Sequence, residues 1–576
     1  MQNNNTINQK ADLIWAIADK LTGVYKPHEY GEVILPLTVI RRFDCILSDT
    51  KNAVLGKYDE VKNLPMKDVL LRKASGYEFY NTSKYTFERL LDDPDHIEEN
   101  FRDYLNGFSD NVQDIIEKFK FDGHITTMAN KDILFIVLKE FTTDKGNLHP
   151  NEISNLEMGY IFEEIIRRFS ESHNEDAGQH YTPREVIQLM VNILFYDDND
   201  MLSGNNVAKT VYDPACGTGG MLSVAEEYIH SLNASTEIVP FGQELNDQTF
   251  AICKADMLIK GNNADFIKDG NTLSDDQFKG QTFDYILSNP PFGREWKNEK
   301  PKVEEEAKLG FGGRFGPGLP AASDGQMLFL LTTIAKMKDI SQGGSRIAII
   351  HNGSPLFTGD AGSGPSEIRK YILENDMLEA IIALPNDIFY NTGIATYIWV
   401  LSNKKAGTVR EGKVQLIDAN KMFVKRRKAL GNKRNDISEE QIAEITKIYG
   451  DFIENDISKI FDNSDFGYTK IVVERPLKDE NGNPVFKKNK PEPDSSLRDT
   501  ENVPLKEDIE EYFNREVIPF SPDAWIDKKK SKVGYEIPFT RYFYKYEAPR
   551  PSAEIMAEIL ELEKELSGSL KEIFDL

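Results

Sequence analysis

From about residue 210 the chain alternates apolar runs of strand length with stretches of helical spacing, and this alternation limits the fold more than any other feature. The expected strands are 210–212, 237–244, 265–267, 283–287, 346–351, 378–384 and 396–402, and the expected helices are 220–230, 247–259, 325–339 and 366–375. Strands that alternate with helices predict parallel βαβ units. We therefore expect an α/β fold whose doubly wound, mostly parallel sheet is covered on both faces.

The strand expected at 283–287 is followed by the motif Asn289-Pro290-Pro291-Phe292. The prolines make this loop rigid and remove backbone donors, so carbonyl groups and the Asn289 amide remain as acceptors beside an aromatic ring. Open α/β sheets bind ligands at the carboxyl ends of their strands. Such a loop suits an exocyclic amino group on a flat heterocycle. An ordinary strand-to-loop turn, with Phe292 capping the core, explains these four residues equally well.

A second strand end carries the glycine-rich stretch 213–220, Asp-Pro-Ala-Cys-Gly-Thr-Gly-Gly, which leads into an expected helix. Glycines let a ligand approach the backbone and meet free amides at the helix start. The spacing differs from that of a dinucleotide-binding loop, and the lysine of a P-loop is absent. The next expected strand ends at Glu244, an acid that can bind the two hydroxyls of a ribose. Together these features suggest a nucleoside without phosphates, for which S-adenosylmethionine is the obvious candidate.

Charge and composition restrict how this chain of 576 residues could bind nucleic acid. It has 94 acidic and 69 basic residues, a formal net charge of −25. A protein that binds DNA alone usually has a basic face. DNA binding here would need a partner subunit or local basic patches, as at 425–428, 433–434 and 528–532, where solvated loops are the simpler interpretation.

Composition also indicates a cytoplasmic protein of several domains. No apolar run is long enough to span a membrane, and the first ten residues are polar. The cysteines Cys45, Cys216 and Cys253 have no metal-ligand spacing, which fits a reducing compartment and predicts no metal site. The expected domains are a helical domain at 1–150, a catalytic domain at 151–420 and a C-terminal region at 421–576.

The amino-terminal region predicts helices without visible chemistry. Apolar residues between 13 and 21 share one helical face, and a second apolar stretch, 33–43, is expected to end around Arg41 and Arg42. Packing or docking of a partner is the default role of this domain.

A polar loop before the expected helix 186–195 holds further candidate residues. Thr182, Pro183 and Glu185 have the spacing of an N-cap, a first-turn proline and a capping box. His180 and Tyr181 are not required by such a cap, so they are additional candidates for a site.

Two other segments are expected to act on neighbours. The charged and then glycine-rich insertion 297–324 follows the Asn-Pro-Pro-Phe loop, which predicts a mobile flap over the site. The end of the chain, 552–576, predicts a helix whose apolar residues recur at spacings near 3.5: Ile555, Ile559, Leu562, Leu566 and Ile573. This is typical of a helix that binds a partner helix, although an ordinary surface helix looks much the same.

The order of these motifs resembles that of amino-methylating DNA methyltransferases. The glycine-rich loop, Gly242-Gln243-Glu244 and Asn289-Pro290-Pro291-Phe292 follow one another, and Gly-Gln-His-Tyr-Thr-Pro lies upstream, as in the N6-adenine group. With the stretches 13–19, 30–35, 344–357 and 466–468 and the terminal helix, nearly the whole chain resembles the modification subunit of Type I restriction-modification systems. The resemblance implies transfer of a methyl group from S-adenosylmethionine to the N6 amino group of adenine in DNA.

The resemblance also implies roles for individual residues. Asn289 and the Pro290 carbonyl would accept hydrogen bonds from the adenine amino group, and Phe292, after Pro291, would stack on the flipped base. For the cofactor, Asp213 would order the glycine-rich loop, Glu244 would hold the ribose, and the remaining residues would surround the methionine part: Gly217, Thr218, Gly219, Gln179, His180, Tyr181, Thr182 and Pro183.

One position departs from the family pattern. The family often has an acid where this chain has Asn271, a group that contacts the cofactor adenine. An amide can still accept that bond, and Asp265 is a competing candidate. The stretches 384–389 and 392–394 also resemble family pattern near the flipped base, but a packed strand and loop explains them equally well.

The implied partners are double-stranded DNA with the adenine flipped out, a specificity subunit that reads the sequence, a second modification subunit and a restriction or translocase subunit, with no membrane. An alternative is a self-sufficient adenine methyltransferase that reads DNA with residues from about 420 onward. A cofactor-binding scaffold is disfavoured by the intact motifs. Methylation of glutamine on a protein is disfavoured by the chain length and the helical amino-terminal domain.

Overall fold

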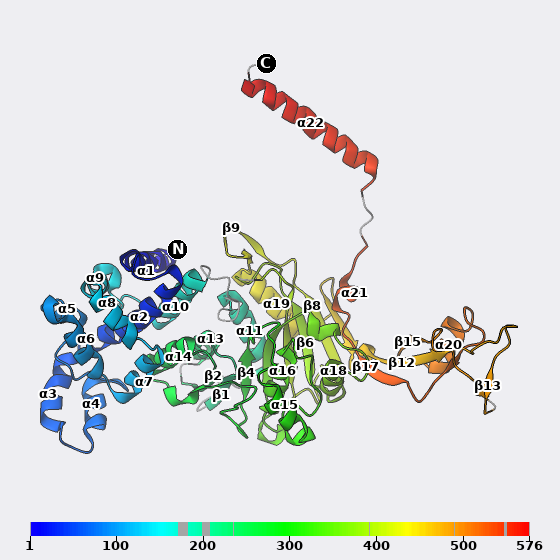
Figure 1. Cartoon of the computed structure of the whole chain (residues 1–576), viewed down its shortest axis with the longest axis horizontal. Helices are drawn as coiled ribbons and strands as arrows, with labels where there is room; N and C mark the ends of the chain where they lie inside the picture. Colours follow the sequence, from blue (N-terminus) through cyan, green and yellow to red (C-terminus); the bar gives the residue numbers. More distant parts are fainter. Residues whose placement is uncertain are drawn as a thin grey trace. The chain divides into compact units, whose positions relative to one another are not determined.

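The computed structural model describes residues 2–170, 182–198, 208–233, 235–390, 392–488, 490–546 and 550–574. The chain divides into two compact units, Met1–Ile537 and Pro538–Leu576. The first unit contains the predicted sheet and most of the helices (Figure 1). The domain limits expected at residues 150 and 420 stay predictions.

The amino-terminal region is helical, as predicted. Its helices are α1 (Gln2–Leu21), α2 (Tyr30–Leu47), α3 (Lys51–Val61), α4 (Lys67–Ser75), α5 (Phe87–Leu90), α6 (Ile97–Asn106), α7 (Asp110–Lys118), α8 (Asp122–Asn130) and α9 (Leu134–Phe141), followed by α10 (Asn155–Ser170). The predicted end of the second helix near Arg41 and Arg42 is wrong. Both guanidinium groups are buried inside the helix bundle, where Arg41 Nε donates to Gly146 O at 3.1 Å and Arg42 Nη1 to Ile153 O at 2.9 Å. These bonds compensate for the lost hydration of the two guanidinium groups, so α2 continues through Arg41 and Arg42 to Leu47.

A nine-stranded sheet forms the centre of the first unit, in the order β11-β8-β6-β7-β5-β4-β1-β2-β3. Its strands are β1 (Ala208–Asp213), β2 (Glu237–Glu244), β3 (Ile267–Asp269), β4 (Tyr285–Ser288), β5 (Arg346–Asn352), β6 (Leu378–Ala383), β7 (Thr396–Ser402), β8 (Lys413–Asp418) and β11 (Ser458–Asp462). β7 runs antiparallel to β5 and β6, and β11 runs antiparallel to β8, while the other neighbours are parallel. The predicted doubly wound, mostly parallel sheet is confirmed.

Helices cover the sheet on both faces. The helices of this part are α11 (Arg184–Phe195), α13 (Gly220–Leu232), α14 (Asp247–Lys260), α15 (Lys300–Ala307), α16 (Gln326–Ala335), α17 (Ser354–Phe357), α18 (Gly364–Glu374) and α19 (Glu439–Asp451). The helices α11, α13, α14 and α19 share one core with the amino-terminal helices, and α16 packs on β5 from the opposite face. The strand expected at 265–267 starts later, because Asn263 caps a short turn at Ala264–Phe266 that precedes β3.

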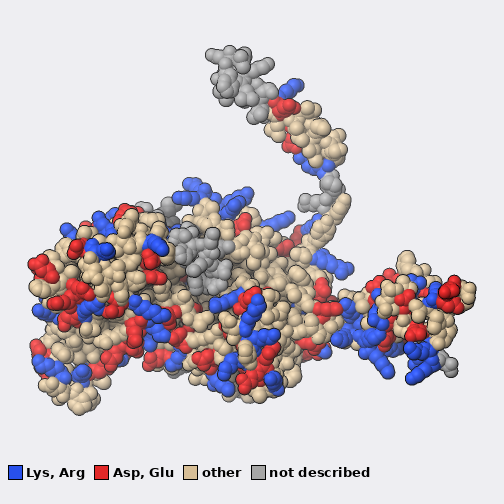
Figure 2. All heavy atoms as spheres, in the orientation of Figure 1, with Lys and Arg blue, Asp and Glu red and all other residues tan. Residues whose placement is uncertain are grey.

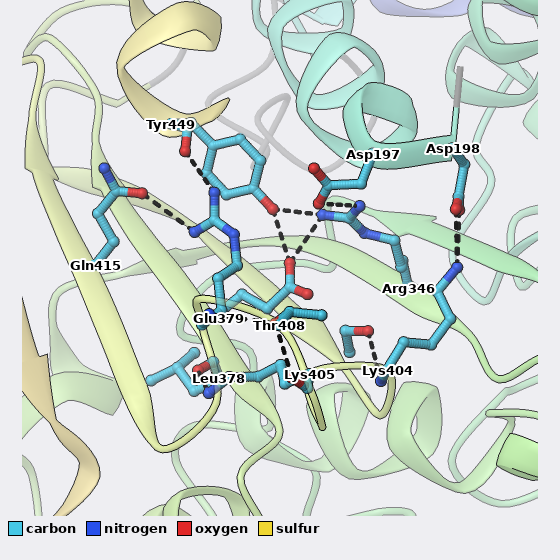
Figure 3. Close-up of polar contacts among 12 residues, drawn as sticks. Asp197, Asp198, Arg346, Leu378, Glu379, Lys404, Lys405, Thr408, Gln415 and Tyr449 are labelled. Atoms are coloured by element: carbon cyan, nitrogen blue, oxygen red, sulfur yellow. Dashed lines mark hydrogen bonds and ion pairs between the residues drawn. The ribbon is translucent and has the colours of Figure 1, made fainter. Parts of the chain in front are cut away.

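A buried ionic cluster fixes α19 on the sheet (Figure 3). Arg346 Nη2 of β5 donates to Glu379 Oε2 of β6 at 2.8 Å, and the Tyr449 hydroxyl of α19 donates to the same oxygen at 2.7 Å. Burial alone would raise the pKa of the Glu379 carboxyl, but the charge of Arg346 holds that pKa below its usual range. Both charges of the pair are therefore retained inside the core.

The remaining elements are smaller. Strands β12 (Gly467–Glu474), β15 (Asp499–Pro504), β16 (Trp525–Ile526) and β17 (Lys532–Tyr535) form a second sheet beside α20 (Ile509–Glu516), and two hairpins are β9 (Val424–Leu430) with β10 (Lys433–Asp436) and β13 (Phe486–Lys487) with β14 (Lys490–Pro491). The second unit contains α21 (Phe539–Phe543) and the predicted terminal helix, α22 (Ser552–Phe574). Its Ile555, Ile559 and Leu562 are exposed. Among the described helices, none is long and apolar enough to cross a membrane.

Candidate active site

The two motif loops meet at the point where the strand order reverses. β1 and β4 are neighbours, and their flanking partners, β2 and β5, lie on opposite sides. The glycine-rich loop follows β1, and Asn289-Pro290-Pro291-Phe292 follows β4. Because a crevice opens at the carboxyl ends of such a pair of strands, the sheet itself brings both motifs to one site.

In the side-chain amide of Asn289, the nitrogen is hydrogen-bonded to another described residue and the oxygen is not. Its Nδ2 donates to Thr182 Oγ1 at 2.8 Å, whereas its Oδ1 is buried and has no hydrogen-bond partner among the described residues. Leaving a buried acceptor unpaired costs about 1–3 kcal/mol. The bond from Nδ2 to Thr182 fixes the orientation of the amide. The site therefore contains an acceptor, Asn289 Oδ1, that has no donor among the described residues.

The same bond explains why the predicted capping box is wrong. Helix α11 begins at Arg184 with Pro183 in the N-cap position, and no side chain caps it. The Thr182 hydroxyl is occupied by Asn289, and the Glu185 carboxylate pairs with Lys433 Nζ. The candidates Gln179, His180 and Tyr181 lie outside the described residues.

Phe292 is half-buried beside the 384–389 stretch. Its ring meets the Phe389 ring edge to face, with the centroids 6.1 Å apart and an angle of 88° between the planes. Pro290 is buried, and Pro291 lines the larger of two adjoining cavities. A second aromatic residue therefore packs on the Phe292 ring.

The glycine-rich loop has the backbone conformation that requires glycine. Gly217 and Gly219 have φ values of +54° and +85°, and a Cβ at Gly219 would lie 2.8 Å from Cys253 Sγ. Gly217 N donates to Glu244 Oε2 at 2.8 Å, and Asn246 N donates to Glu244 Oε1 at 2.8 Å. The Glu244 carboxylate is thereby fixed against the loop, at the end of β2.

Asp213 lies buried at the end of β1. Ala215 N donates to its Oδ1 at 3.0 Å across the turn, an arrangement that orders the loop. Burial raises the pKa of the Asp213 carboxyl to about 7, because the hydrogen bond from Ala215 only partly offsets the loss of hydration and Glu244 adds a nearby negative charge.

Two cavities adjoin at Ala215. The smaller, of about 30 Å³, is lined by Glu163, Thr182, Asp213, Gly217, Thr218 and Asn289, among others. The larger, of about 360 Å³, is lined by residues that include Gln243, Glu244, Asn271, Pro291, Trp296 and Glu299. Most of the predicted cofactor and catalytic residues therefore lie around one continuous crevice, whereas Asp265 lies before β3, away from it.

Both the oxygen and the nitrogen of the Asn271 side-chain amide are hydrogen-bonded within the protein. Its Oδ1 accepts from Leu273 N at 3.0 Å and Ser274 N at 3.3 Å, and its Nδ2 donates to Glu299 Oε1 at 2.7 Å. The expectation that this amide oxygen is available to a cofactor does not fit these bonds. The structure instead places the Glu299 carboxylate, from the insertion, on the wall of the larger cavity. Sequence reasoning missed Glu299, whose only signal was the charge of the 297–307 run.

The insertion 297–324 is anchored beside this cavity. Trp296, Val303 and Phe315 are buried, and Arg314 donates to Glu306 Oε2 at 2.7 Å and to Thr272 O. The insertion therefore borders the site, as predicted; its mobility stays a prediction.

A doubly wound sheet with a glycine-rich loop, an acid at the end of the next strand and an unpaired amide oxygen before two prolines is the arrangement of a methyltransferase that acts on amino groups. Sequence comparison agrees with this class. The N-6 DNA Methylase family model matches residues 154–484, and the HsdM N-terminal domain model matches residues 10–141. The chain belongs to the N-6 DNA methylase family. The resemblance to Type I modification subunits is thereby confirmed, and the chain is an N6-adenine DNA methyltransferase.

Individual relatives agree with this family. The Type I restriction enzyme MjaIX methylase subunit of Methanocaldococcus jannaschii is 25% identical over 456 residues, which cover 75% of each chain. The HindI methylase subunit of Haemophilus influenzae is 30% identical over 292 residues, 50% of this chain and 59% of that protein. The fold is similar to that of a type I restriction-modification methyltransferase subunit from Streptococcus thermophilus, with a TM-score of 0.63, 22% identity and coverage of 80% of this chain and 97% of that one.

Proposed function

We propose that Asn289 is the residue that activates the adenine amino group, and its buried, unpaired Oδ1 is the observation that carries the proposal. The amino hydrogens of a flipped adenine supply the donor that this oxygen lacks among the described residues, and the Pro290 carbonyl is the second acceptor. Holding both hydrogens keeps the nitrogen lone pair out of conjugation with the ring, so the nitrogen becomes nucleophilic. Phe292 stacks on the base, and the Phe389 ring packs edge to face with the Phe292 ring.

S-adenosylmethionine is the cofactor that fits the adjoining cavities. The smaller cavity is lined by Asp213 and by Glu163, which is ion-paired with Arg184, and no lysine or arginine is among its lining residues within the described part of the chain, which disfavours a phosphate. When bound, the cofactor supplies an electrophilic methyl group. Thr182, Pro183 and the loop Gly217-Thr218-Gly219 hold its methionine part, Asp213 orders this loop, and Glu244 binds the ribose. Glu299, positioned by Asn271, accepts from the amino group of the cofactor adenine.

The test is replacement of Asn289 by Ala. We expect DNA methylation to be lost while binding of S-adenosylmethionine, measured by calorimetry, is retained, because Asn289 Oδ1 serves the base. Mass analysis of DNA from cells with and without the variant would identify the base and the sequence context that lose the methyl group. An Asn289→Ala enzyme that still methylated adenine would refute the assignment.

Sequence readout by a separate specificity subunit follows from the Type I subunits to which this chain is similar. The exposed apolar residues of α22 and the net charge of −25 support a partner-dependent enzyme. We expect the purified chain to show no site-specific methylation until the specificity subunit is added, with a second copy and a restriction subunit completing the cytoplasmic complex. Specific methylation by the chain alone would favour the self-sufficient enzyme.

A further inference from the structure

The hairpin β9–β10 is an exposed basic element in an acidic chain. The register shifts between the pairs Lys433↔Leu430 and Asn435↔Lys425, so β9 has a bulge between them. Figure 2 shows Lys and Arg side chains gathered at the edge where Figure 1 labels β9. Four of its cations are exposed and belong to no ion pair within the described part of the chain: Lys425, Arg427, Lys428 and Arg434.

The one acid of the hairpin does not neutralise these four side chains. Asp436 is paired with Arg426, at 2.6 Å between Nη1 and Oδ1, and with Lys433, at 3.0 Å. The hairpin therefore displays uncompensated positive charge. Exposed cations without an ion pair are common on a basic protein, whereas this chain has a net charge of −25.

Strand β10 of the hairpin is hydrogen-bonded to the loop 386–389, whose Phe389 contacts Phe292. Asp387 O accepts from Arg434 N at 2.9 Å and from Asn435 N at 3.2 Å, and Asn435 Nδ2 donates to Asn386 O at 2.8 Å. Asp387 has a φ of +54°, a strained conformation for this residue that the two bonds support. Two residues further on, Phe389 packs on Phe292.

A second connection leads from the hairpin to Asn289. Lys433 is buried, donates to Ile388 O at 3.0 Å and pairs with Glu185 in the first turn of α11. Thr182, which accepts from the Asn289 amide, lies three residues before Glu185. The hairpin is thus connected both to Phe292, through Phe389, and to Asn289, through Glu185 and Thr182.

We propose that the β9–β10 hairpin binds the phosphates of the DNA strand that flanks the flipped adenine. A base enters the site only if the duplex is held close to Phe292, and the energy for unstacking must come from contacts to the rest of the DNA. Lysine and arginine side chains supply such contacts by neutralising phosphates and releasing counterions. This role rests on the proposed function and adds to it the surface that orients the substrate.

The test uses the complex of this chain with its specificity subunit and a duplex that contains the recognised site. The triple variant Lys425→Ala, Arg427→Ala, Lys428→Ala is compared with a charge-matched control on exposed lysines of the amino-terminal region, Lys67→Ala, Lys73→Ala, Lys131→Ala. The dissociation constant is measured by fluorescence anisotropy between about 50 and 200 mM salt. Because the hairpin variant can no longer neutralise three phosphates, its slope of log K against log salt should become shallower by about 2–3, while the control keeps the wild-type slope.

Several results would overturn the proposal. An unchanged salt slope in the hairpin variant would show that these cations do not neutralise phosphates. Loss of the specificity subunit from the variant complex, with DNA affinity retained where the complex forms, would mean that the hairpin binds an acidic protein surface instead. The single reversal Arg427→Glu is the second variant, and it should weaken binding more than Arg427→Ala. If the wild-type complex methylates adenine and the variant slope is unchanged, only the hairpin role fails; if the wild-type complex does not methylate adenine, the proposed function itself fails.

Discussion

Replacing Thr182 by Val tests whether the amide of Asn289 must be oriented before the base arrives. Valine keeps the size of the side chain but removes the hydroxyl that accepts from Asn289 Nδ2 at 2.8 Å. One neutral hydrogen bond contributes about 0.5–1.5 kcal/mol, and an unsatisfied buried donor costs about 1–3 kcal/mol. If about 1–2 kcal/mol of this is lost in the transition state, kcat falls by about 5–30-fold. The affinity for cofactor should change little, because the hydroxyl of Thr182 is bonded to Asn289 and valine retains the methyl group with which Thr182 would contact the methionine part of the cofactor.

The matched control is Thr182→Ser, which keeps the hydroxyl and removes a methyl group. Steady-state methylation of a duplex containing the site gives kcat, and calorimetry gives the dissociation constant for S-adenosylhomocysteine. If Thr182 positions Asn289, the serine variant retains most of kcat and the valine variant does not. Equal losses in both variants, or a weaker cofactor affinity of the valine variant at unchanged kcat, would show that Thr182 acts through packing or through the cofactor and does not position Asn289.

Further predictions concern the cofactor and the core. Glu299→Gln should weaken the binding of S-adenosylhomocysteine by about tenfold or more, because one charge-assisted hydrogen bond is lost. The analogue that has hydrogen in place of the adenine amino group should bind both proteins alike in calorimetry. Unchanged affinity for S-adenosylhomocysteine would exclude Glu299 as the acceptor. Asp213 has a pKa of about 7 in the folded protein, above its unfolded value of 3.8, so its contribution to stability falls as the pH rises from about 4 to about 7 and is constant above that range. The melting temperature of Asp213→Asn relative to wild type should therefore rise across this interval in the absence of cofactor, and a constant difference would contradict the raised pKa. Glu379→Gln should lower the free energy of unfolding by about 3 kcal/mol, since it breaks a buried ion pair, whereas Asp451→Asn at the exposed Lys447 pair should cost less than about 1 kcal/mol in the same urea titration; equal costs would show that the buried cluster adds no special stability.

The pattern of apolar residues along the sequence predicted the limits of buried strands and helices well. The strands β2 and β7 have the predicted limits, and α13 and α14 end within a few residues of theirs, because apolar runs and apolar periodicity report which residues face the core. The errors fall where a polar side chain has a distant partner. The helix α2 passes its predicted end because Arg41 and Arg42 are bonded to carbonyl groups more than a hundred residues away in the chain. The capping box fails because Thr182 and Glu185 have partners outside α11.

By itself, the sequence determined the kind of fold and which loops carry chemistry. Alternating strands and helices require a parallel sheet, and motifs placed at strand ends must then lie along one edge of it. Only the tertiary structure decided which side chains meet there. Thr182 reaches Asn289 across 107 residues, Glu299 reaches Asn271 across 28, and Cys216 and Cys253, distant in sequence, bring their sulfur atoms to 3.9 Å. Periodicity records burial, whereas such pairs depend on strand order and on the packing of the whole core, which no local pattern contains.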